Sequence, residues 1–579
     1  MKQYYTDERN VQILIALMKE HGIKRVVASP GSTNVTFVAS IQQDSFFEIY
    51  SCVDERSAAY IACGMAAETC EPVALSCTGA TASRNYFPAL TEAFYRKLPI
   101  LVITSTQEEA KIGHMIPQVI DRTQQPKDTV KMSAHLQAIK DDLDEWDVTV
   151  KANAAILELH HHGLGPVHVN LTTRYSKNFT VKELKPVHKI ERFCLQDEFP
   201  DLPKCRLAIY VGSHLRWTER LTFAVDKFCA SHDAVVFCDP TANYHGKYRI
   251  YQELRKCQPV VDELAKVDLL IHIGDMSDMC NIVTTHNVWR VSEDGLIADR
   301  YQKLTKVFEM PECLFFEHYA SDNIVNAQHY LEQFEKSYNN LSSSLPELPF
   351  SHIWIASQLS SKLPKNSTIH LGILSPLRSW GYFKLPSSVE AYCNQGGFGI
   401  DGNMSSMVGA SLVNPEKIFF AAVGDLSFFY DMNILGNRHI KSNVRILLVN
   451  NALGAEFHLF KQLNLTYVND IDRYISAGGH FAQKSPNLVR HYAIDLGFEY
   501  LTASTKEEFL SVCERFVTSK LTDKPMIFEV FTNVEDENQA LYKLCHILED
   551  KSIKAVVKNG FKTMLGDNLT QKVKNALNK

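Results

Sequence analysis

Two short apolar runs late in the chain are each followed by a residue that suits a hard metal ion. Residues 418–423 lead through one glycine to Asp425, and residues 446–449 lead through one asparagine to Asn451. Their carboxylate and amide oxygens, with the carbonyl oxygen of Leu453 in the following turn, make three possible ligands. Mg²⁺ prefers oxygen ligands and usually completes its shell with water and substrate phosphates. The pattern therefore predicts a site for a Mg²⁺-bound diphosphate.

These oxygens can meet only if the two runs lie side by side. Short continuous apolar runs are typical of parallel strands covered on both faces, and residues 427–440 between them are long enough for a crossover helix. In such sheets, ligands bind at the carboxyl ends of the strands. The backbone amides of Leu426 and Ser427, which open the crossover helix, would face the same phosphates. Either strand end alone would be an ordinary turn, but the two together favour a cofactor site.

The spacing resembles the thiamin diphosphate signature, in which Gly-Asp-Gly is followed at a similar distance by Asn-Asn. Leu426 replaces the third residue of that signature. Leu453 stands where glycine is common, which leaves its carbonyl available but restricts the backbone angles of the turn. The resemblance implies thiamin diphosphate and Mg²⁺ as cofactors, with Asp425, Asn451 and Leu453 as metal ligands. It implies further cofactor contacts from Gly424, Leu426 and Ser427.

A second set of residues near the start of the chain resembles the other half of a thiamin diphosphate site. Glu55 ends a predicted strand and precedes a helix, 57–68, that is rich in small residues. A glutamate before a helix is usually a surface residue that complements the helix dipole. Enzymes of the pyruvate oxidase and acetohydroxyacid synthase type, however, combine such a glutamate and helix with a later glycine turn and an asparagine, here Gly79 and Asn85. The resemblance implies that Glu55 hydrogen-bonds to the cofactor pyrimidine and that Gly31 lies at the same site.

Two further loops carry candidate substrate and cofactor contacts. Residues 112–118 resemble a loop in which family members place a glutamine over the reactive carbon, so His114 and Gln118 are candidate catalytic residues. An exposed histidine and glutamine remain the alternative. In the glycine-rich loop that follows Tyr392, Gly399 permits close backbone approach to a ligand. Ile400 matches the bulky apolar residue that supports the cofactor from below in this superfamily.

Three motifs, 165–170, 394–402 and 424–433, resemble those of the 2-succinyl-5-enolpyruvyl-6-hydroxy-3-cyclohexene-1-carboxylate synthases. The resemblance extends over nearly the whole chain up to about residue 532. It implies decarboxylation of a 2-oxo acid and transfer of the resulting acyl-anion equivalent to a carbonyl or alkene acceptor. It also implies a homodimer or homotetramer, because in this superfamily the glutamate and the metal-binding aspartate come from different subunits.

The chain departs from that family where the family carries arginines for substrate carboxylates. Those three positions are occupied by Thr33, Gln107 and Gln395, whereas Arg378 is retained as a candidate for one carboxylate. Loss of bidentate carboxylate donors is not a conservative change. We therefore expect a different and less anionic substrate pair than isochorismate and 2-oxoglutarate. The alternatives are the family's own reaction, simple decarboxylation of a 2-oxo acid, or a noncatalytic paralogue.

A chain of 579 residues is too long for one hydrophobic core. Alternating strand and helix signals predict the α/β class, with three doubly wound parallel-sheet domains. We expect a pyrimidine-binding domain at 1–180, a central domain at 190–337, a diphosphate- and Mg²⁺-binding domain at 350–534, and a C-terminal extension at 535–579. The central domain lacks a Gly-x-Gly-x-x-Gly fingerprint, which argues against a nucleotide-binding dehydrogenase and against flavin.

Composition favours a soluble enzyme, with 45% hydrophobic residues, 22% charged residues and a net charge of -6. This mild acidity argues against a nucleic-acid partner. The absence of a long apolar run and of a signal-peptide pattern predicts a cytoplasmic protein that does not enter a membrane. The 14 cysteines show no metal-binding spacing and are expected to be reduced. Three consecutive histidines, 160–162, are interpreted as a solvated helix end, because consecutive helical residues cannot all face one ion.

Overall fold

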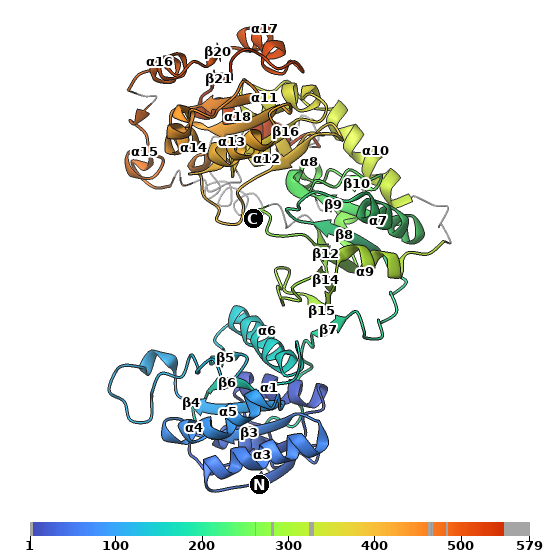
Figure 1. The fold of residues 1–579 in the computed structure, drawn as a ribbon, viewed down its shortest axis with the longest axis vertical. Helices are drawn as coiled ribbons and strands as arrows, with labels where there is room; N and C mark the ends of the chain where they lie inside the picture. The colour runs from blue at the N-terminus through green and yellow to red at the C-terminus, as the bar shows by residue number, and fades with distance from the viewer. Residues whose placement is uncertain are drawn as a thin grey trace, which may run out of the picture. The chain divides into compact units, whose positions relative to one another are not determined.

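The computed structural model describes residues 4–260, 262–278, 283–322, 329–460, 465, 467–481 and 484–548 (Figure 1). The chain divides into two compact units. Unit 1 comprises Met1–Pro200 and Asn287–Met310, and unit 2 comprises Asp201–His286 and Pro311–Lys579.

The first sheet of unit 1 contains six parallel strands in the order β2-β1-β3-β4-β6-β5. Its strands are β1 (Arg25–Ala28), β2 (Glu48–Ser51), β3 (Val73–Cys77), β4 (Ile100–Thr106), β5 (Ser133–Leu136) and β6 (Val167–Thr172). Successive residues of the central strands point to opposite faces, and both faces are apolar. Helices therefore cover the sheet on both sides, as Figure 1 shows.

Two separate cores form on these faces. Helices α1 (Arg9–Glu20) and α6 (Asp142–Glu158) share one core with the sheet, and α3 (Glu55–Thr69) and α5 (Phe87–Tyr95) share the other. Small residues of α3, among them Ala58, Ala59 and Ala62, are fully buried and let this helix pack closely against the sheet. Two shorter helices complete this part of unit 1: α2 (Val35–Ile41) and α4 (Thr81–Asn85).

Unit 1 also contains three parallel strands from two distant parts of the chain. They are β7 (Glu191–Cys194), β14 (Val288–Ser292) and β15 (Leu304–Glu309), with β15 between the other two. In the register of β15 and β7, Glu309 lies opposite Cys194. The carboxyl ends of these two strands therefore bring a carboxylate and a thiol to one edge.

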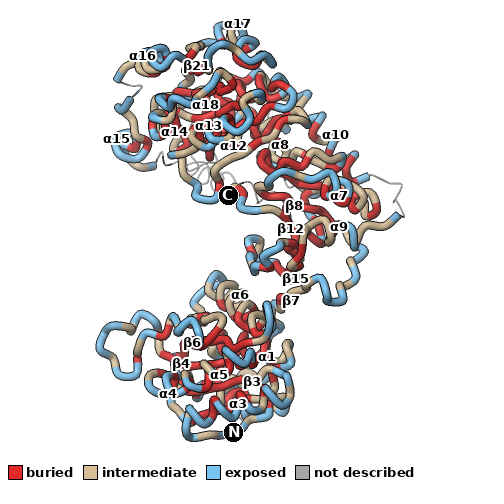
Figure 2. The backbone as a smooth tube through the Cα atoms, viewed as in Figure 1, coloured by how far each residue is buried: buried red, intermediate tan, exposed pale blue. Residues whose placement is uncertain are grey.

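The sheet at the end of unit 2 again contains six parallel strands, in the order β17-β16-β18-β19-β21-β20. Its strands are β16 (Thr368–Leu371), β17 (Glu390–Tyr392), β18 (Phe419–Gly424), β19 (Val444–Asn450), β20 (Glu499–Ala503) and β21 (Met526–Phe531). The helices on one face are α11 (His352–Leu359), α12 (Ser375–Gly381), α17 (Lys506–Phe516) and α18 (Val534–Cys545). The helices on the other are α13 (Asn403–Val413), α14 (Asp425–Asp431) and α16 (Leu488–Asp495). Figure 2 shows the buried sheet between these helices.

Four more parallel strands of unit 2 follow the order β10-β9-β8-β12. They are β8 (Leu207–Val211), β9 (Val235–Cys238), β10 (Arg249–Ile250) and β12 (Leu269–Ile273). The helices in this part are α7 (Glu219–His232), α8 (Glu253–Lys256), α9 (Glu312–Tyr319) and α10 (His329–Ser343). The remaining elements of unit 2 are the strand pair β11 (Lys266–Val267) and β13 (Thr284–Thr285) and the helix α15 (Ile471–Tyr474).

The predicted α/β class with parallel sheets is confirmed by these arrangements. The predicted crossover helix at 427–440 is shorter, because α14 ends at Asp431 and continues only as a 3₁₀ segment, Met432–Gly436. The C-terminal segment begins with α18, whose residues Ala540, Leu541 and Leu544 are buried in the core. Residues 549–579 of the predicted extension lie outside the described part. None of the helices in the described residues is both long and apolar enough to cross a membrane.

Candidate cofactor site

The predicted metal ligands lie at the carboxyl ends of two paired strands. Strands β18 and β19 pair in parallel, with Gly424 opposite Val449. Asp425 is the first residue of α14, directly after β18, and Asn451 directly follows β19. The Asp425 side chain accepts a hydrogen bond from the Leu426 amide at 2.8 Å. The carboxylate and the amide side chain therefore share one edge of the sheet, as the strand pattern predicts.

Burial of the charged Asp425 carboxylate costs free energy unless a cation binds it. The residue is only 5% exposed, and burial raises the pKa of Asp425 to about 7, against backbone amides of Leu426, Ala452 and Leu453 that lower it. The largest influences that lower this pKa are hydrogen bonds from backbone amides. A bound cation would replace the lost hydration of this carboxylate.

The neighbouring amide side chain has a free oxygen atom. Asn451 Oδ1 is buried and has no hydrogen-bond partner among the described residues. A buried oxygen of this kind costs free energy unless it is paired, and Mg²⁺ accepts amide oxygen as a ligand. The Leu453 carbonyl accepts one hydrogen bond, from the Ala455 amide at 2.9 Å, and a carbonyl has a second lone pair. The residues present at this edge therefore fit Mg²⁺.

The loop that carries Ile400 is tied to the same strand end. Ser427 Oγ donates a hydrogen bond to the Ile400 carbonyl at 2.8 Å. A side chain at Gly399 would place its Cβ 2.3 Å from Asp401 Oδ1, so a substitution here would force the Asp401 side chain to move. The fold thereby brings the predicted apolar support next to the predicted metal ligands.

These residues line one cavity of about 800 Å³, a volume that suits a cofactor-sized ligand. Of the predicted site residues, those in its wall are Ile400, Gly424, Asp425, Leu426, Ser427, Asn451 and Leu453. The wall also contains residues that sequence reasoning missed, among them His352, Leu374, Ser375, Gly454, Glu456 and Phe457. A strand followed by a Ser-Pro helix start, Thr368–Leu371 and Ser375-Pro376, is a signal that could have indicated Leu374 and Ser375.

Glu55 and Asn85 come together in unit 1. Glu55 is the half-buried first residue of α3, and Asp54 caps this helix by accepting a hydrogen bond from the Ser57 amide at 2.9 Å. The Asn85 side-chain amide donates a hydrogen bond to Glu55 Oε2 at 3.1 Å. This contact orients the carboxyl group, and it joins two residues that belong to the same predicted signature.

The predicted glycines lie in two turns that pack against each other. A Cβ at Gly31 would lie 2.7 Å from the Thr78 Cβ, and one at Gly79 would lie 3.2 Å from the Ser105 carbonyl oxygen. The Thr33 and Thr78 hydroxyls also share a hydrogen bond. These turns follow β1 and β3, so unit 1 likewise gathers predicted residues at the carboxyl ends of its strands.

The remaining candidates lie beside these groups and outside the cavity wall. His114 and Gln118 are exposed in the connection between β4 and β5. Gln118 has a left-handed backbone, with φ of 66°, and its carbonyl oxygen would lie 3.3 Å from a Cβ at Gly79. Arg378, in unit 2, forms ion pairs with Glu456 and, at 3.0 Å, with Asp278. Substrate roles for these three residues stay predictions.

Two of the three positions that replace family arginines are buried and hydrogen-bonded within their own units. Thr33 Oγ1 donates to the Ser105 carbonyl at 3.2 Å. Gln395 is 2% exposed, donates to Thr241 Oγ1 at 2.9 Å, and accepts from the Asp278 amide at 2.6 Å. These two side chains therefore face neighbouring protein atoms.

Among the buried cations that sequence reasoning missed is Arg122, which lies in a polar stretch typical of an exposed loop. Arg122 is 1% exposed, and burial lowers its pKa to about 10. Its Nη2 donates to the Ser105 carbonyl at 3.2 Å, whereas Nε and Nη1 have no hydrogen-bond partner among the described residues. A buried guanidinium with two unpaired nitrogens is suited to receive an anion.

Comparisons with known proteins agree on one class of enzyme. Residues 9–128 match the model of the thiamine pyrophosphate enzyme N-terminal TPP binding domain. The chain is 30% identical to the 2-succinyl-5-enolpyruvyl-6-hydroxy-3-cyclohexene-1-carboxylate synthase of Bacteroides thetaiotaomicron, over 94% of this chain and all of the relative. It is 31% identical to the synthase of the same name from Bacteroides fragilis, over 94% of this chain and all of the relative. The corresponding Flavobacterium johnsoniae protein is 29% identical over 77% of this chain and 84% of its own length.

Proposed function

Because the chain belongs to the 2-succinyl-5-enolpyruvyl-6-hydroxy-3-cyclohexene-1-carboxylate synthase family of thiamin diphosphate enzymes, we propose that it is a Mg²⁺-dependent carboligase. It decarboxylates a 2-oxo acid and transfers the acyl-anion equivalent to a carbonyl or alkene acceptor. The observation that carries this proposal is the buried Asp425 carboxylate beside the unpaired Asn451 oxygen, in the wall of a cavity of about 800 Å³.

In this proposal Asp425, Asn451 and the Leu453 carbonyl hold Mg²⁺. Diphosphate contacts come from Gly424, Leu426 and Ser427, and Ile400 and Gly399 support the cofactor rings. When bound, thiamin diphosphate supplies the carbon that accommodates the negative charge left after carbon dioxide departs. The chain's own contribution is to neutralise the diphosphate, to exclude water from the cavity and to orient the reacting groups.

Glu55 moves the proton that activates the cofactor. Its carboxyl group shares a proton with the pyrimidine ring, and the hydrogen bond from Asn85 at 3.1 Å keeps that carboxyl in one orientation. Gly31 and Gly79 keep the adjoining turns free of side chains. His114 and Gln118 contact the substrate from their exposed loop, and Arg378 holds one substrate carboxylate.

We also propose the assembly that these roles require. In the family, the residues that match Glu55 and Asp425 come from different subunits, so the smallest active form is a homodimer, and a homotetramer can contain two such dimers. The proposed domains span residues 1–180, 190–337 and 350–534, with an extension at 535–579. The proposed location is the cytoplasm.

The substrate pair is less anionic than isochorismate and 2-oxoglutarate, with a short 2-oxo acid such as pyruvate as donor. This part of the proposal is supported by Thr33 and Gln395, which stand at positions of family arginines and form hydrogen bonds within the protein. Hydrogen bonds to charged groups contribute roughly 1.5 to 3 kcal/mol each, so two missing arginines would lower affinity or rate by about 10²- to 10⁴-fold.

The family's own reaction is the second candidate. It is favoured by 30% to 31% identity over the full length of two named synthases. The buried Arg122, with two nitrogens unpaired among the described residues, offers a cation for a carboxylate that the matched positions lack. Both candidates use the same cofactor and differ only in the substrates.

Purified protein with thiamin diphosphate and Mg²⁺ tests both parts. We expect saturable, Mg²⁺-dependent cofactor binding and release of carbon dioxide from a short 2-oxo acid. Isochorismate with 2-oxoglutarate should react about 10²-fold or more slowly than the best pair. Efficient product formation from that pair would support the second candidate and overturn the first. Failure to bind thiamin diphosphate would overturn both.

A further inference from the structure

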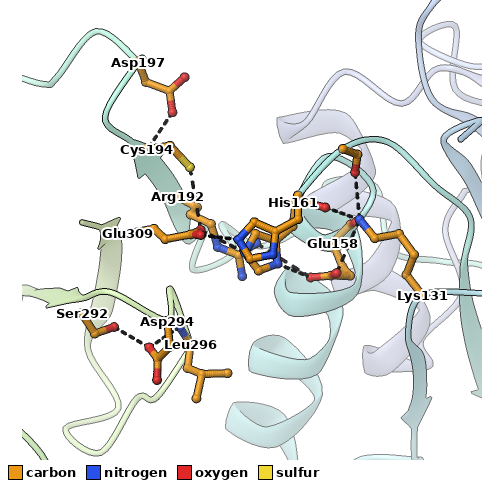
Figure 3. A network of polar contacts seen from close by, with 12 residues as sticks. Lys131, Glu158, His161, Arg192, Cys194, Asp197, Ser292, Asp294, Leu296 and Glu309 are labelled. Carbon is orange, nitrogen blue, oxygen red and sulfur yellow. Dashed lines mark hydrogen bonds and ion pairs between the residues drawn. The ribbon is translucent and has the colours of Figure 1, made fainter. Parts of the chain in front are cut away.

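Two consecutive histidines of unit 1, His161 and His162, converge on the Glu309 carboxylate, and Figure 3 shows the contact of His161. His161 Nε2 lies 2.9 Å from Glu309 Oε2, and His162 Nε2 lies 2.5 Å from Glu309 Oε1. The two rings stack with their centroids 3.8 Å apart. Their ligand atoms and the Glu309 carboxylate oxygen all lie within 4.8 Å of one another. Two imidazoles and a carboxylate at this separation form a possible metal-ligand set.

The end of α6 makes this convergence possible. The helix ends at Glu158, so His161 and His162 lie in the turn that follows it, and His162 has a left-handed backbone with φ of 47°. The rule that consecutive helical residues cannot face one ion therefore does not apply to them. The expected solvated helix end describes His160 and His162, which are exposed, but is wrong for His161, whose side chain is only 13% exposed.

The other side of the cluster is built by two paired strands. Glu309 ends β15 and lies opposite Cys194, which ends β7. Cys194 Sγ is 3.7 Å from Glu309 Oε2. Gly295, with φ of 59°, packs so closely that a Cβ there would lie 2.6 Å from the Glu309 carboxylate. The carboxylate therefore has little room to turn away from the histidines.

A second carboxylate fixes the orientation of His161. Its Nδ1 lies 2.8 Å from Glu158 Oε2, on the side of the ring opposite Glu309. A carboxylate on the second ring nitrogen is the usual support of a metal-binding histidine, because it fixes the tautomer and the ring orientation. The cluster thus has the outer contact that a metal ligand needs.

A lysine holds the turn that presents both histidines. Lys131 Nζ donates to the carbonyls of Glu158 at 2.9 Å, of Gly163 at 2.8 Å, and of His161. These bonds fix the backbone on both sides of the histidine pair, as Figure 3 shows for His161. The ligands are therefore held in place before any ion binds, which favours binding.

We propose that His161, His162 and Glu309 bind a divalent transition metal of the Zn²⁺ class, with the Cys194 thiolate as the fourth ligand. Zn²⁺ binds nitrogen and oxygen at about 2.0 to 2.2 Å and sulfur at about 2.3 Å, so tetrahedral neighbours lie roughly 3.3 to 3.5 Å apart. The sulfur-to-oxygen distance of 3.7 Å is close to that separation, but the sulfur does not lie within 4.8 Å of all three other ligand atoms, so the Cys194 side chain must turn toward the histidines to bind the ion. The two imidazole nitrogens must move outward by less than about 1 Å, and one of them, on the exposed His162, is free to do so.

Charge and access agree with this assignment. Ion pairs join both nearby cations to Glu158, with Lys131 at 3.5 Å and Arg192 at 3.9 Å. Glu309 therefore keeps its charge for the ion. A cavity of about 470 Å³, lined in part by His161, His162 and Cys194, gives a route of entry. Imidazole and thiolate ligands select a transition metal over Mg²⁺.

A bound ion would join the connection after α6 to the ends of β7 and β15. Binding to the native state alone raises the ratio of folded to unfolded protein by a factor of 1 + [Zn²⁺]/Kd, about 100-fold at a free concentration 100 times Kd. The site uses none of the residues proposed for the cofactor, so it can be tested independently of them.

The test uses full-length protein that has been treated with a chelator and then saturated with thiamin diphosphate and Mg²⁺. Calorimetric titration with Zn²⁺ should show one ion per chain. His162→Ala and Glu309→Gln should each lower the affinity at least about 100-fold, by analogy with the loss that even outer contacts cause. His160→Ala is the matched control, because this neighbouring histidine lies outside the ligand set, and it should bind as the wild type does.

Binding of Co²⁺ tests whether the Cys194 thiolate is the fourth ligand. Co²⁺ bound to the wild type should show a thiolate-to-metal charge-transfer band in the near ultraviolet, and Cys194→Ser should lose that band while still binding the ion. A band that persists in Cys194→Ser would overturn the thiolate ligand. Equal Zn²⁺ affinity in wild type, His162→Ala and Glu309→Gln would overturn the site. His162 is exposed, so its substitution tests the site even if Glu309→Gln fails to fold.

Discussion

The cofactor edge of unit 2 and the histidine cluster of unit 1 are built from similar chemistry but are left in opposite states. At the cofactor edge, Asn451 Oδ1 has no hydrogen-bond partner among the described residues, and the Asp425 carboxylate accepts hydrogen bonds from backbone amides. In the cluster, each histidine contacts Glu309, and His161 also contacts Glu158. The cofactor edge therefore costs free energy until an ion binds there, whereas the histidine cluster is stable without an ion.

The largest effect is expected from substitution of Asp425 at the cofactor edge. Asp425→Ala removes the only charged ligand proposed for Mg²⁺, so Mg²⁺-dependent binding of thiamin diphosphate should be abolished. The variant should fold normally, because it removes a buried carboxylate that lacks a cationic partner in the protein. Fluorescence titration with thiamin diphosphate and Mg²⁺ measures the first effect, and thermal unfolding measures the second. Asp470→Ala, an exposed aspartate, serves as the control, and unchanged cofactor affinity in Asp425→Ala would remove the metal assignment.

The edge that this variant tests was predictable because its residues follow local rules. Apolar runs at 418–423 and 446–449 predict strands, and parallel pairing brings Asp425 and Asn451 to the same end. The family predicted from the motifs is confirmed by the relatives. His161 and Glu309 are separated by 148 positions, and no local pattern links the turn after a helix to a distant strand end.

The same limit explains why Arg122 was missed. Its burial depends on the packing of the turn at Gly79 and of the Ser105 carbonyl around a polar stretch that has no apolar periodicity. The short form of α14 has a related cause, since helix length depends on how much surface the sheet offers. Strand ends can thus be predicted from the sequence, but the tertiary contacts of loops cannot.

Glu55 lies between these two cases, because its carboxylate has one hydrogen-bond partner and is only half-buried. Glu55→Gln keeps the volume of the side chain but cannot share the proton that activates the cofactor. Turnover should fall about 10²-fold or more, the usual scale for a positioned acid or base, while cofactor affinity stays near that of the wild type. Hydrogen exchange at C2 of bound thiamin diphosphate measures the step itself. Wild-type exchange in Glu55→Gln would contradict the role, and Glu92→Gln, on α5, is the control.

Substitution of Glu309 tests whether the histidine cluster stabilises the protein without a metal ion. Glu309→Ala leaves both histidines without their shared carboxylate, and hydrogen bonds to charged groups contribute roughly 1.5 to 3 kcal/mol each. Metal-free protein should therefore lose roughly 2 to 4 kcal/mol of stability, less than two full bonds because His162 is exposed, in contrast to Asp425→Ala, which should lose little. Urea unfolding in the presence of a chelator measures both. Glu198→Ala, at an exposed glutamate, should have no effect, and equal stability of Glu309→Ala and wild type would show that the cluster does not stabilise the protein.

A third histidine of unit 1 gives the smallest effect, because its partners are hydroxyl groups instead of carboxylates. His168 in β6 lies 2.7 Å from Thr104 Oγ1 and 2.7 Å from Ser133 Oγ. Burial, with smaller contributions from the charges of Arg122 and His135, lowers the pKa of His168 to about 3. Since an unfolded histidine titrates near its ordinary value of 6.5, the unfolded chain binds more protons than the folded one between about pH 6.5 and pH 3. The stability that neutral His168 contributes is therefore present above pH 6.5 and is lost as the pH falls, by roughly 1.4 kcal/mol per pH unit.

Urea unfolding between pH 7 and pH 5 should show this slope in the wild type and a flatter one in His168→Gln, whereas His439→Gln, at an exposed histidine, should keep it. An unchanged slope in His168→Gln would mean that other buried groups, and not this ring, set the acid limit of unit 1.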